Sequence, residues 1–338
     1  MRALNINPSL ATAICALALQ SVVIPAQAAP TWTRIATQSG SICPTGYIRV
    51  DEKALPSGVV VPKFCVMKYE AKKANTGIGD RSIGGSAGTT PVSVAAGTPW
   101  VSLTWQDARS ACAATGSQLI SENQWLSLAH QVTAVGSNWS GGAVGSGFLY
   151  SGHNDNAPAA ALAASTDDSD GYNGTGDTAS NPGDSTFNNF PSNAAQAYQG
   201  QRRTLTLPNG QVIWDLAGNV WEWTDATIAK DSRYHGGTSG WLDFSSATNL
   251  PLDKKPPATY GADHGMGRYY DGGNASGAYN NVTENPDNCV SNGGYCAPTA
   301  AFFRGGYWGD GSSAGVFTLN LGIGRSYTSA YIGFRCTR

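Results

Sequence analysis

Short runs rich in β-branched and aromatic residues, separated by polar turns, recur along this chain. Such runs, bounded by glycine, proline, asparagine or serine, are typical of β-strands. The triplet Pro208-Asn209-Gly210 predicts the turn of a hairpin. We expect the strand at Tyr47–Val50 to pair with the strand at Val59–Tyr69. The expected strands lie at Tyr47–Val50, Val59–Tyr69, Arg203–Leu207, Val212–Trp214, Val316–Leu319 and Tyr331–Cys336.

Two segments carry helix signals instead. Thr104 has the side chain of an N-cap and is followed by an acidic residue in the first turn. That helix is expected to run to about Ala114, because Gly116 ends it. Ser121 is the expected cap of a second helix. The apolar face of this helix comprises Trp125, Leu126, Leu128 and Ala129.

Three long segments show almost no regular pattern, namely 71–98, 136–200 and 225–300. A structureless loop as long as the middle one is unusual in a compact domain, so something other than secondary structure must hold it. Hard cations bind oxygen-rich loops, and this loop is rich in aspartate. Its acidic residues include Asp155, Asp167, Asp168, Asp170 and Asp177.

Composition narrows the function classes. Charged residues make up 13% of the chain and the formal net charge is −2, with no basic patch. We therefore expect neither nucleic acid nor an anionic membrane as partner. The 42 glycines and 10 tryptophans indicate many turns and large flat side chains.

Residues 1–28 have the pattern of a bacterial-type signal peptide. Arg2 precedes an apolar stretch from Leu10 to Ile24, and Ala26-Gln27-Ala28 supplies the small residues of a cleavage site. We expect a signal peptide at 1–28, a linker at 29–40 and a single domain at 41–338. The protein is expected to be exported, with the periplasm, the cell surface and secretion left open, and no transmembrane segment in the mature chain.

Cysteine usage agrees with export. Cys15 is removed with the signal peptide, which leaves six cysteines. An even number of cysteines in an oxidising compartment favours disulfides. Cys43 and Cys65 flank the first two expected strands and are candidates for a bridge. Cys289 and Cys296 lie close in sequence and are expected to bridge locally.

Three separated segments resemble one family. The first runs from Val101 through Cys112 to Trp125, the second is Trp214–Trp223 with its Gly-Asn-Val-Trp-Glu-Trp core, and the third combines Arg304–Trp308 with Gly333–Cys336. In this order they resemble the formylglycine-generating enzyme (sulfatase-modifying factor) family. The resemblance implies an α+β, C-type lectin-like fold, loop-rich, with short antiparallel strands and two main helices.

The resemblance also implies structural calcium and one disulfide. A first Ca²⁺ would lie in a turn, held by the carboxylates of Asp215 and Glu222 and the carbonyls of Gly218 and Val220. A second would involve Asp170 and the carbonyl of Tyr172. The implied bridge joins Cys112 in the first helix to Cys336 near the C-terminus.

The catalytic residues of that family are not retained. Its two cysteines fall at Asp310 and Gly315, and neither side chain forms a thiolate. We therefore expect a non-catalytic ligand-binding module. The alternatives are a formylglycine-generating-type oxidase or other enzyme with a non-standard site, such as a hydrolase, and a surface structural or adhesion component.

The C-terminal segment offers a binding face for a protein or glycan on a cell surface. Tyrosine, tryptophan and arginine contribute much contact area at low entropic cost. The candidate ligand-binding residues are Tyr307, Trp308, Asp310, Arg325, Tyr327 and Tyr331. Of these, Trp308 is the one most expected to pack in the core.

The same segment also resembles the variable region of retroelement-diversified receptor proteins, in which adenine-directed mutation randomises some codons and spares others. Ala314–Leu321 and Ile332–Arg335 would then be scaffold. The candidate variable positions are Tyr307, Gly309, Asp310, Gly322, Ile323, Tyr327 and Tyr331.

Overall fold

A computed structural model describes the protein over most of its length. The described residues are 43–74, 90–180, 200–229, 232, 234, 240–246, 249–271 and 299–338. They belong to one unit, Ile42–Arg338. The expected signal peptide, the linker and the Cys289–Cys296 bridge lie outside the described residues.

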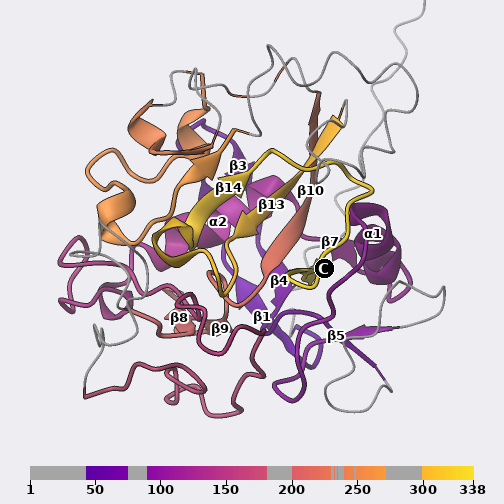
Figure 1. Cartoon of the computed structure of the whole chain (residues 1–338), viewed down its shortest axis with the longest axis horizontal. Coiled ribbons are helices and arrows are strands. Elements are labelled where there is room, and N and C mark those ends of the chain that lie inside the picture. Colours follow the sequence, from indigo (N-terminus) through magenta and orange to yellow (C-terminus); the bar gives the residue numbers. More distant parts are fainter. Residues whose placement is uncertain are drawn as a thin grey trace, which may run out of the picture. The chain divides into compact units, whose positions relative to one another are not determined.

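The described part is a loop-rich α+β domain with short strands, mostly antiparallel, as expected (Figure 1). The helices are α1 (Trp105–Ala113) and α2 (Glu122–Val132). The strands before α2 are β1 (Tyr47–Val50), β2 (Lys53–Ala54), β3 (Val60–Val61), β4 (Phe64–Met67), β5 (Lys72–Lys73), β6 (Pro91–Val92) and β7 (Gln118–Leu119). Those after it are β8 (Thr204–Thr206), β9 (Val212–Trp214), β10 (Trp221–Ala229), β11 (Trp241–Leu242), β12 (Tyr269–Tyr270), β13 (Thr299–Gly305), β14 (Gly315–Asn320), β15 (Ile332–Phe334) and β16 (Cys336–Thr337).

Both helices begin where the sequence places their caps. The Thr104 side chain accepts from the Asp107 backbone N–H, and Asp107 reaches back to the Thr104 N–H. Ser121 and Gln124 form the same reciprocal pair at the start of α2. Each capping box satisfies backbone donors that a helix leaves free in its first turn.

Two sheets organise the domain. The smaller has the strand order β1-β4-β16-β7, and the larger has the order β11-β12-β14-β13-β10-β15. The predicted pairing of the first two strand segments is confirmed, with Tyr47 opposite Met67 in an antiparallel ladder. The predicted hairpin is formed by β8 and β9, with Leu205 opposite Ile213.

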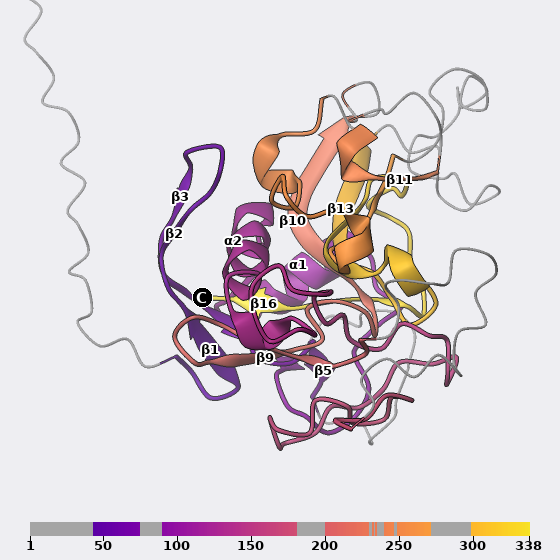
Figure 2. The same ribbon diagram turned by 90° about the vertical axis from the view of Figure 1, so that its left-hand side faces the viewer.

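The helices cover opposite faces of the larger sheet. Alternate residues of β10 point to opposite sides. Trp221 and Trp223 pack in the same cluster as Ala108 and Cys112 of α1. Thr224, on the other side, donates from its hydroxyl to Glu122 at the start of α2. Figure 1 shows α2 behind β13 and β14 and α1 to the right of β10, and Figure 2 shows the same elements from the side.

Two disulfides staple this arrangement. Cys43 is bonded to Cys65, as the flanking positions suggested. Cys112 in α1 is bonded to Cys336 in β16, which confirms the pairing implied by the family resemblance. The second bridge spans 224 residues and therefore ties the first helix to the C-terminal strand.

One region departs from expectation. The sequence predicted a turn through Glu222 and a loop from residue 225 onward. Instead Trp221–Ala229 is one continuous strand, β10, which pairs antiparallel with β13 and parallel with β15. The prediction was wrong because Glu222 is buried and paired inside the protein, whereas the pattern treated it as a turn residue.

No helix among the described residues is long and apolar enough to cross a membrane.

Candidate functional site

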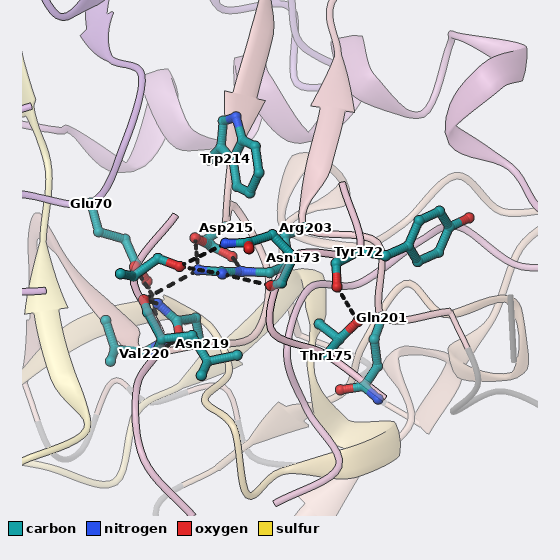
Figure 3. A network of polar contacts seen from close by, with 12 residues as sticks. Glu70, Tyr172, Asn173, Thr175, Gln201, Arg203, Trp214, Asp215, Asn219 and Val220 are labelled. Carbon is teal, nitrogen blue, oxygen red and sulfur yellow. Dashed lines mark hydrogen bonds and ion pairs between the residues drawn. The ribbon is translucent and has the colours of Figure 1, made fainter. Parts of the chain in front are cut away.

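The Trp214–Trp223 motif lies at a cluster of buried charges (Figure 3). Asp215 adopts a left-handed backbone conformation with φ of 52° and is almost fully buried. Its two carboxylate oxygens accept from Nε and Nη2 of Arg203, both at 2.7 Å. This is the bidentate geometry in which guanidinium and carboxylate fit best.

The Arg203 guanidinium also holds the long loop that the sequence left without secondary structure. It donates to the carbonyls of Leu162 at 3.2 Å, Ala163 at 2.7 Å and Asn173 at 3.0 Å. One arginine therefore contacts a carboxylate and three backbone carbonyls. Sequence reasoning missed Arg203, because only the folded chain brings loop 162–173 against β8.

Arg335 makes a matching set of contacts from the loop between β15 and β16. Its Nε donates to Glu222 Oε2 at 2.6 Å, and its Nη2 donates to Glu222 Oε1. It also donates to the carbonyls of Met67, Trp214 and Asp215, at 3.1 to 3.2 Å. Both side chains of the pair are fully buried.

Glu70 and Lys72 complete the charge cluster. Asn219 Nδ2 donates to Glu70 Oε2 at 2.5 Å, and the Val220 N–H donates to Oε1 at 3.2 Å. Burial, together with the nearby carboxylates of Asp215 and Glu222, raises the pKa of Glu70 well above its usual value. Burial lowers the pKa of Lys72 to about 8.

These residues do not fit the calcium site that the resemblance implied. The structure brings Asp215, Gly218, Val220 and Glu222 together, but both oxygens of each carboxylate already accept from an arginine. Within the described part of the chain, no group of three or more His, Cys, Asp or Glu residues is placed to hold a metal ion. The cations at this site are guanidinium groups.

The second expected calcium site is also differently arranged. Asp170 is exposed, and the carbonyl of Tyr172 accepts from both the N–H and the hydroxyl of Thr175. The neighbouring Asp168 binds Lys68 at 2.7 Å and accepts from the indole of Trp214 at 3.0 Å. Calcium at Asp170 and Tyr172 stays a prediction.

The predicted binding face is assembled at the end of β13. Gly305 and Gly306 have φ of 93° and 83°, and a Cβ on Gly306 would lie 2.7 Å from the Cα of Ala314. Only glycine suits this close approach. The chain then turns through residues 307–310, all of which are partly buried.

Four of the six predicted face residues form one aromatic cluster. The rings of Tyr307 and Tyr331 have centroids 4.5 Å apart, and those of Tyr307 and Trp308 are 4.9 Å apart. The hydroxyls of Tyr327 and Tyr331 lie 3.2 Å apart. All four side chains are half-buried. We refer to Tyr307, Tyr327 and Tyr331 as the tyrosine cluster.

Arg325 and Trp308 differ in how far they reach the surface. Arg325 is exposed, and its carbonyl accepts from the backbone N–H of Trp105. Trp308 packs against Val101, Ala161 and Val220, in line with the expectation that it is mainly a core residue. Two candidate variable positions, Gly322 and Ile323, are buried and therefore do not lie on this face.

Asp310 lies beside the tyrosine cluster. Its Oδ2 accepts from the Tyr307 N–H at 3.0 Å, and its own N–H donates to the Tyr307 carbonyl at 3.1 Å. Burial raises the pKa of Asp310 to about 8. Burial, Asp310 and Tyr331 together raise the pKa of Tyr307 to about 12.

No protein-family model and no curated protein sequence matches the chain. Among solved structures, the chain is similar to the Major Tropism Determinant U1 variant, with 14% identity over 87% of this chain and 55% of that chain, at a TM-score of 0.31. It is similar to the P3c variant, with 11% identity over 88% of this chain and 73% of that chain, at a TM-score of 0.28. For the I1 variant the identity is 12% over the same shares, at a TM-score of 0.27. The chain thus spans about half the length of the U1 variant, and likenesses at this level carry no argument about function.

Proposed function

We propose that this protein is an exported, non-catalytic ligand-binding module whose binding face is the tyrosine cluster with its neighbours Trp308, Asp310 and Arg325. One observation carries the proposal: residues 307, 327 and 331, separated in sequence, converge on one half-buried aromatic surface. Half-exposed tyrosines contribute much binding energy at low entropic cost. The ligand class is a protein or glycan on a cell surface.

The scaffold beneath this face supports the proposal. Strand β13 leads into the face and strand β15 leaves it, and both flank β10 in the larger sheet. The disulfide between Cys112 and Cys336 fixes the end of the same segment to α1. A rigid support of this kind lets surface side chains change while the backbone stays in place.

The test is a binding screen of the mature protein on glycan and cell-surface protein arrays. We expect specific ligands for the wild-type chain and loss of binding in Tyr331→Ala with an unchanged melting temperature. The matched control is Tyr234→Ala. Tyr234 is also partly buried, but it packs against the core around α2, whereas the tyrosine cluster packs against the core around α1. Equal binding by wild type and Tyr331→Ala to every ligand found would refute the assignment of the face.

A retroelement-diversified face is the finer form of the proposal. Sequencing the last ~40 codons across a natural population tests it. We expect substitutions at Tyr307, Gly309, Asp310, Tyr327 and Tyr331, with Val316–Leu319 unchanged, because the four residues of that run are fully buried. Variation spread evenly over the segment would contradict diversification.

The oxidase alternative requires a thiolate near Asp310. The described cysteines are Cys43, Cys65, Cys112 and Cys336, and all four are in disulfides. No observation in the described part of the chain favours that alternative over binding.

A further inference from the structure

Asp310, which is partly buried, differs from three buried acidic groups in what neutralises it. Glu122 is paired with Arg304 and Lys254, Asp215 with Arg203, and Glu222 with Arg335. In the part of the chain that the structure describes, the Asp310 carboxylate has the Tyr307 N–H as its hydrogen-bond donor and no cationic side chain in ion-pair distance.

A carboxylate that is largely removed from water and has no cation beside it is costly to keep ionised, and such groups are common at functional sites. Burial is the largest cause of the raised pKa of Asp310, which is the response expected of a carboxylate left without a counter-charge. A ligand that supplied the missing positive charge would relieve this cost.

The aromatic rings beside Asp310 favour the same ligand chemistry. A Cβ on Gly309 would lie 2.7 Å from the Tyr307 hydroxyl oxygen, so the Tyr307 ring folds back over the turn that carries Asp310. Tyr331 packs against the same ring, with 4.5 Å between the ring centroids and 31° between the ring planes. The faces of phenol rings attract organic cations, and the attraction is larger where water is excluded.

We propose that the tyrosine cluster and Asp310 bind an organic ammonium group, supplied by a lysine side chain of a partner protein. This inference rests on the proposed function and names the chemistry that its binding face recognises. Asp310 supplies the negative charge and the phenol rings supply the cation–π contacts. Arginine is less suited, because its planar guanidinium favours a bidentate carboxylate, and one Asp310 oxygen is already engaged by the Tyr307 N–H.

Other charged groups surround Asp310 and must be separated from its effect. The Gly311 N–H donates to the Asn154 carbonyl, so the segment carrying His153 and Asp155 packs against this turn. His153 is fully buried, with its Nε2 3.5 Å from Asp155 Oδ1. Tyr307, Tyr327 and Tyr331 are the titratable groups of the face itself, and Arg325 lies on the following loop.

The experiment titrates mature protein labelled with ¹³C-tyrosine, with NMR as the readout. The ammonium probes are N-acetyl-lysine methylamide and choline. Their neutral counterparts, N-acetyl-norleucine methylamide and 3,3-dimethylbutan-1-ol, have similar shapes without the charge. We expect the ammonium probes to shift the Tyr307 and Tyr331 signals with at least about tenfold higher affinity than the neutral ones. Equal affinity for charged and neutral probes, or no shift with either ammonium probe, overturns the proposal.

Asp310→Asn is the decisive variant, because asparagine keeps an acceptor for the Tyr307 N–H and removes the charge. We expect it to lose the preference for ammonium while its melting temperature shows an intact fold. Asp170→Asn, at an exposed aspartate in another loop, is the matched control and should bind as wild type. Retained preference in a folded Asp310→Asn protein refutes the role of Asp310.

A second readout uses the wild-type protein alone and holds even if Asp310→Asn does not fold. With a pKa of about 8, the charged fraction of Asp310 rises about tenfold between pH 7 and pH 9, so choline affinity should rise by about that factor. A flat profile contradicts the proposal. Stronger binding of choline than of the lysine probe would keep the ammonium site but reject lysine as its source.

A failure of the ammonium proposal can be told apart from a failure of the proposed function. If no ammonium probe binds, yet Tyr331→Ala still abolishes a ligand found on the arrays, the face is a binding site for another chemistry.

Discussion

Arg335 and Glu222, 113 positions apart in sequence, form a fully buried bidentate ion pair between the β15–β16 loop and strand β10. Breaking such a pair by removing one partner costs about 3–5 kcal/mol, because the other charge stays buried without compensation. Arg335 also donates to three carbonyls, which would lose their donors at the same time.

We therefore expect Arg335→Leu to lower the free energy of unfolding by at least about 3 kcal/mol. Urea denaturation measures this as a fall in the midpoint with little change in slope. The control is Arg49→Leu, whose exposed pair with Asp51 should contribute at most about 1 kcal/mol. Similar losses in the two variants would show that the buried pair has no special role.

Calcium should not stabilise the protein through Asp215 and Glu222. Because both carboxylates already bind arginines, we expect an Asp170→Asn variant, which lacks the second expected site, to have the same melting temperature with calcium and with chelator. A true site with a Kd of about 10 μM would add about 2.7 kcal/mol at 1 mM calcium. A clear rise in melting temperature with calcium would restore the metal prediction made from the sequence.

Replacing both Cys112 and Cys336 by serine should destabilise the protein more than replacing Cys43 and Cys65. The Cys112–Cys336 bridge spans 224 residues and the Cys43–Cys65 bridge spans 22. Chain entropy predicts losses of about 5 and about 3 kcal/mol respectively, as upper figures. Unfolding midpoints of the two double variants, measured without reductant, give the order. The reverse order would mean that local packing, not loop length, decides the contribution.

Asp310 should make stability depend on pH. Its pKa is about 8 in the folded protein and near the ordinary aspartate value in the unfolded chain. Between about pH 4 and pH 8, therefore, Asp310 is protonated in the folded protein and ionised in the unfolded chain. The stability that it contributes is full at acidic pH and falls as pH rises toward 8. We expect Asp310→Asn to be more stable than wild type at pH 8, by about 1–2 kcal/mol after allowance for partial exposure.

Urea midpoints at pH 5 and pH 8 test this expectation. The difference between wild type and Asp310→Asn should be larger at pH 8. An unchanged difference between the two pH values would indicate that Asp310 is ionised across the whole range.

The sequence predicted the features that depend on nearby residues. The capping pairs at Thr104 and Ser121 lie within one helical turn, and the β8–β9 hairpin depends on a short turn, so both can be inferred from the local pattern. The three members of the tyrosine cluster were expected on one face, because all three lie in the C-terminal segment that resembles a ligand face, and their role in binding stays a prediction. The bridge between Cys112 and Cys336 required the family resemblance.

The charge cluster could not be predicted in this way. Arg203 and Arg335 acquire their partners only when loop 162–173, strand β10 and the C-terminal segment meet in space. A sequence pattern treats Glu222 and Asp215 as exposed or metal-binding acids, because it cannot show which distant cation lies beside them. The length of β10 was missed for the same reason.

The position of β16 has a consequence for biosynthesis. Residues 336–337 form an inner strand between β4 and β7, so the smaller sheet cannot close until this segment has been translated. A product cut short within residues 307–331 would leave β4 and β7 without their shared neighbour and Cys112 without its partner. Such products would be open to proteases, so the tyrosine cluster would be presented only by complete chains.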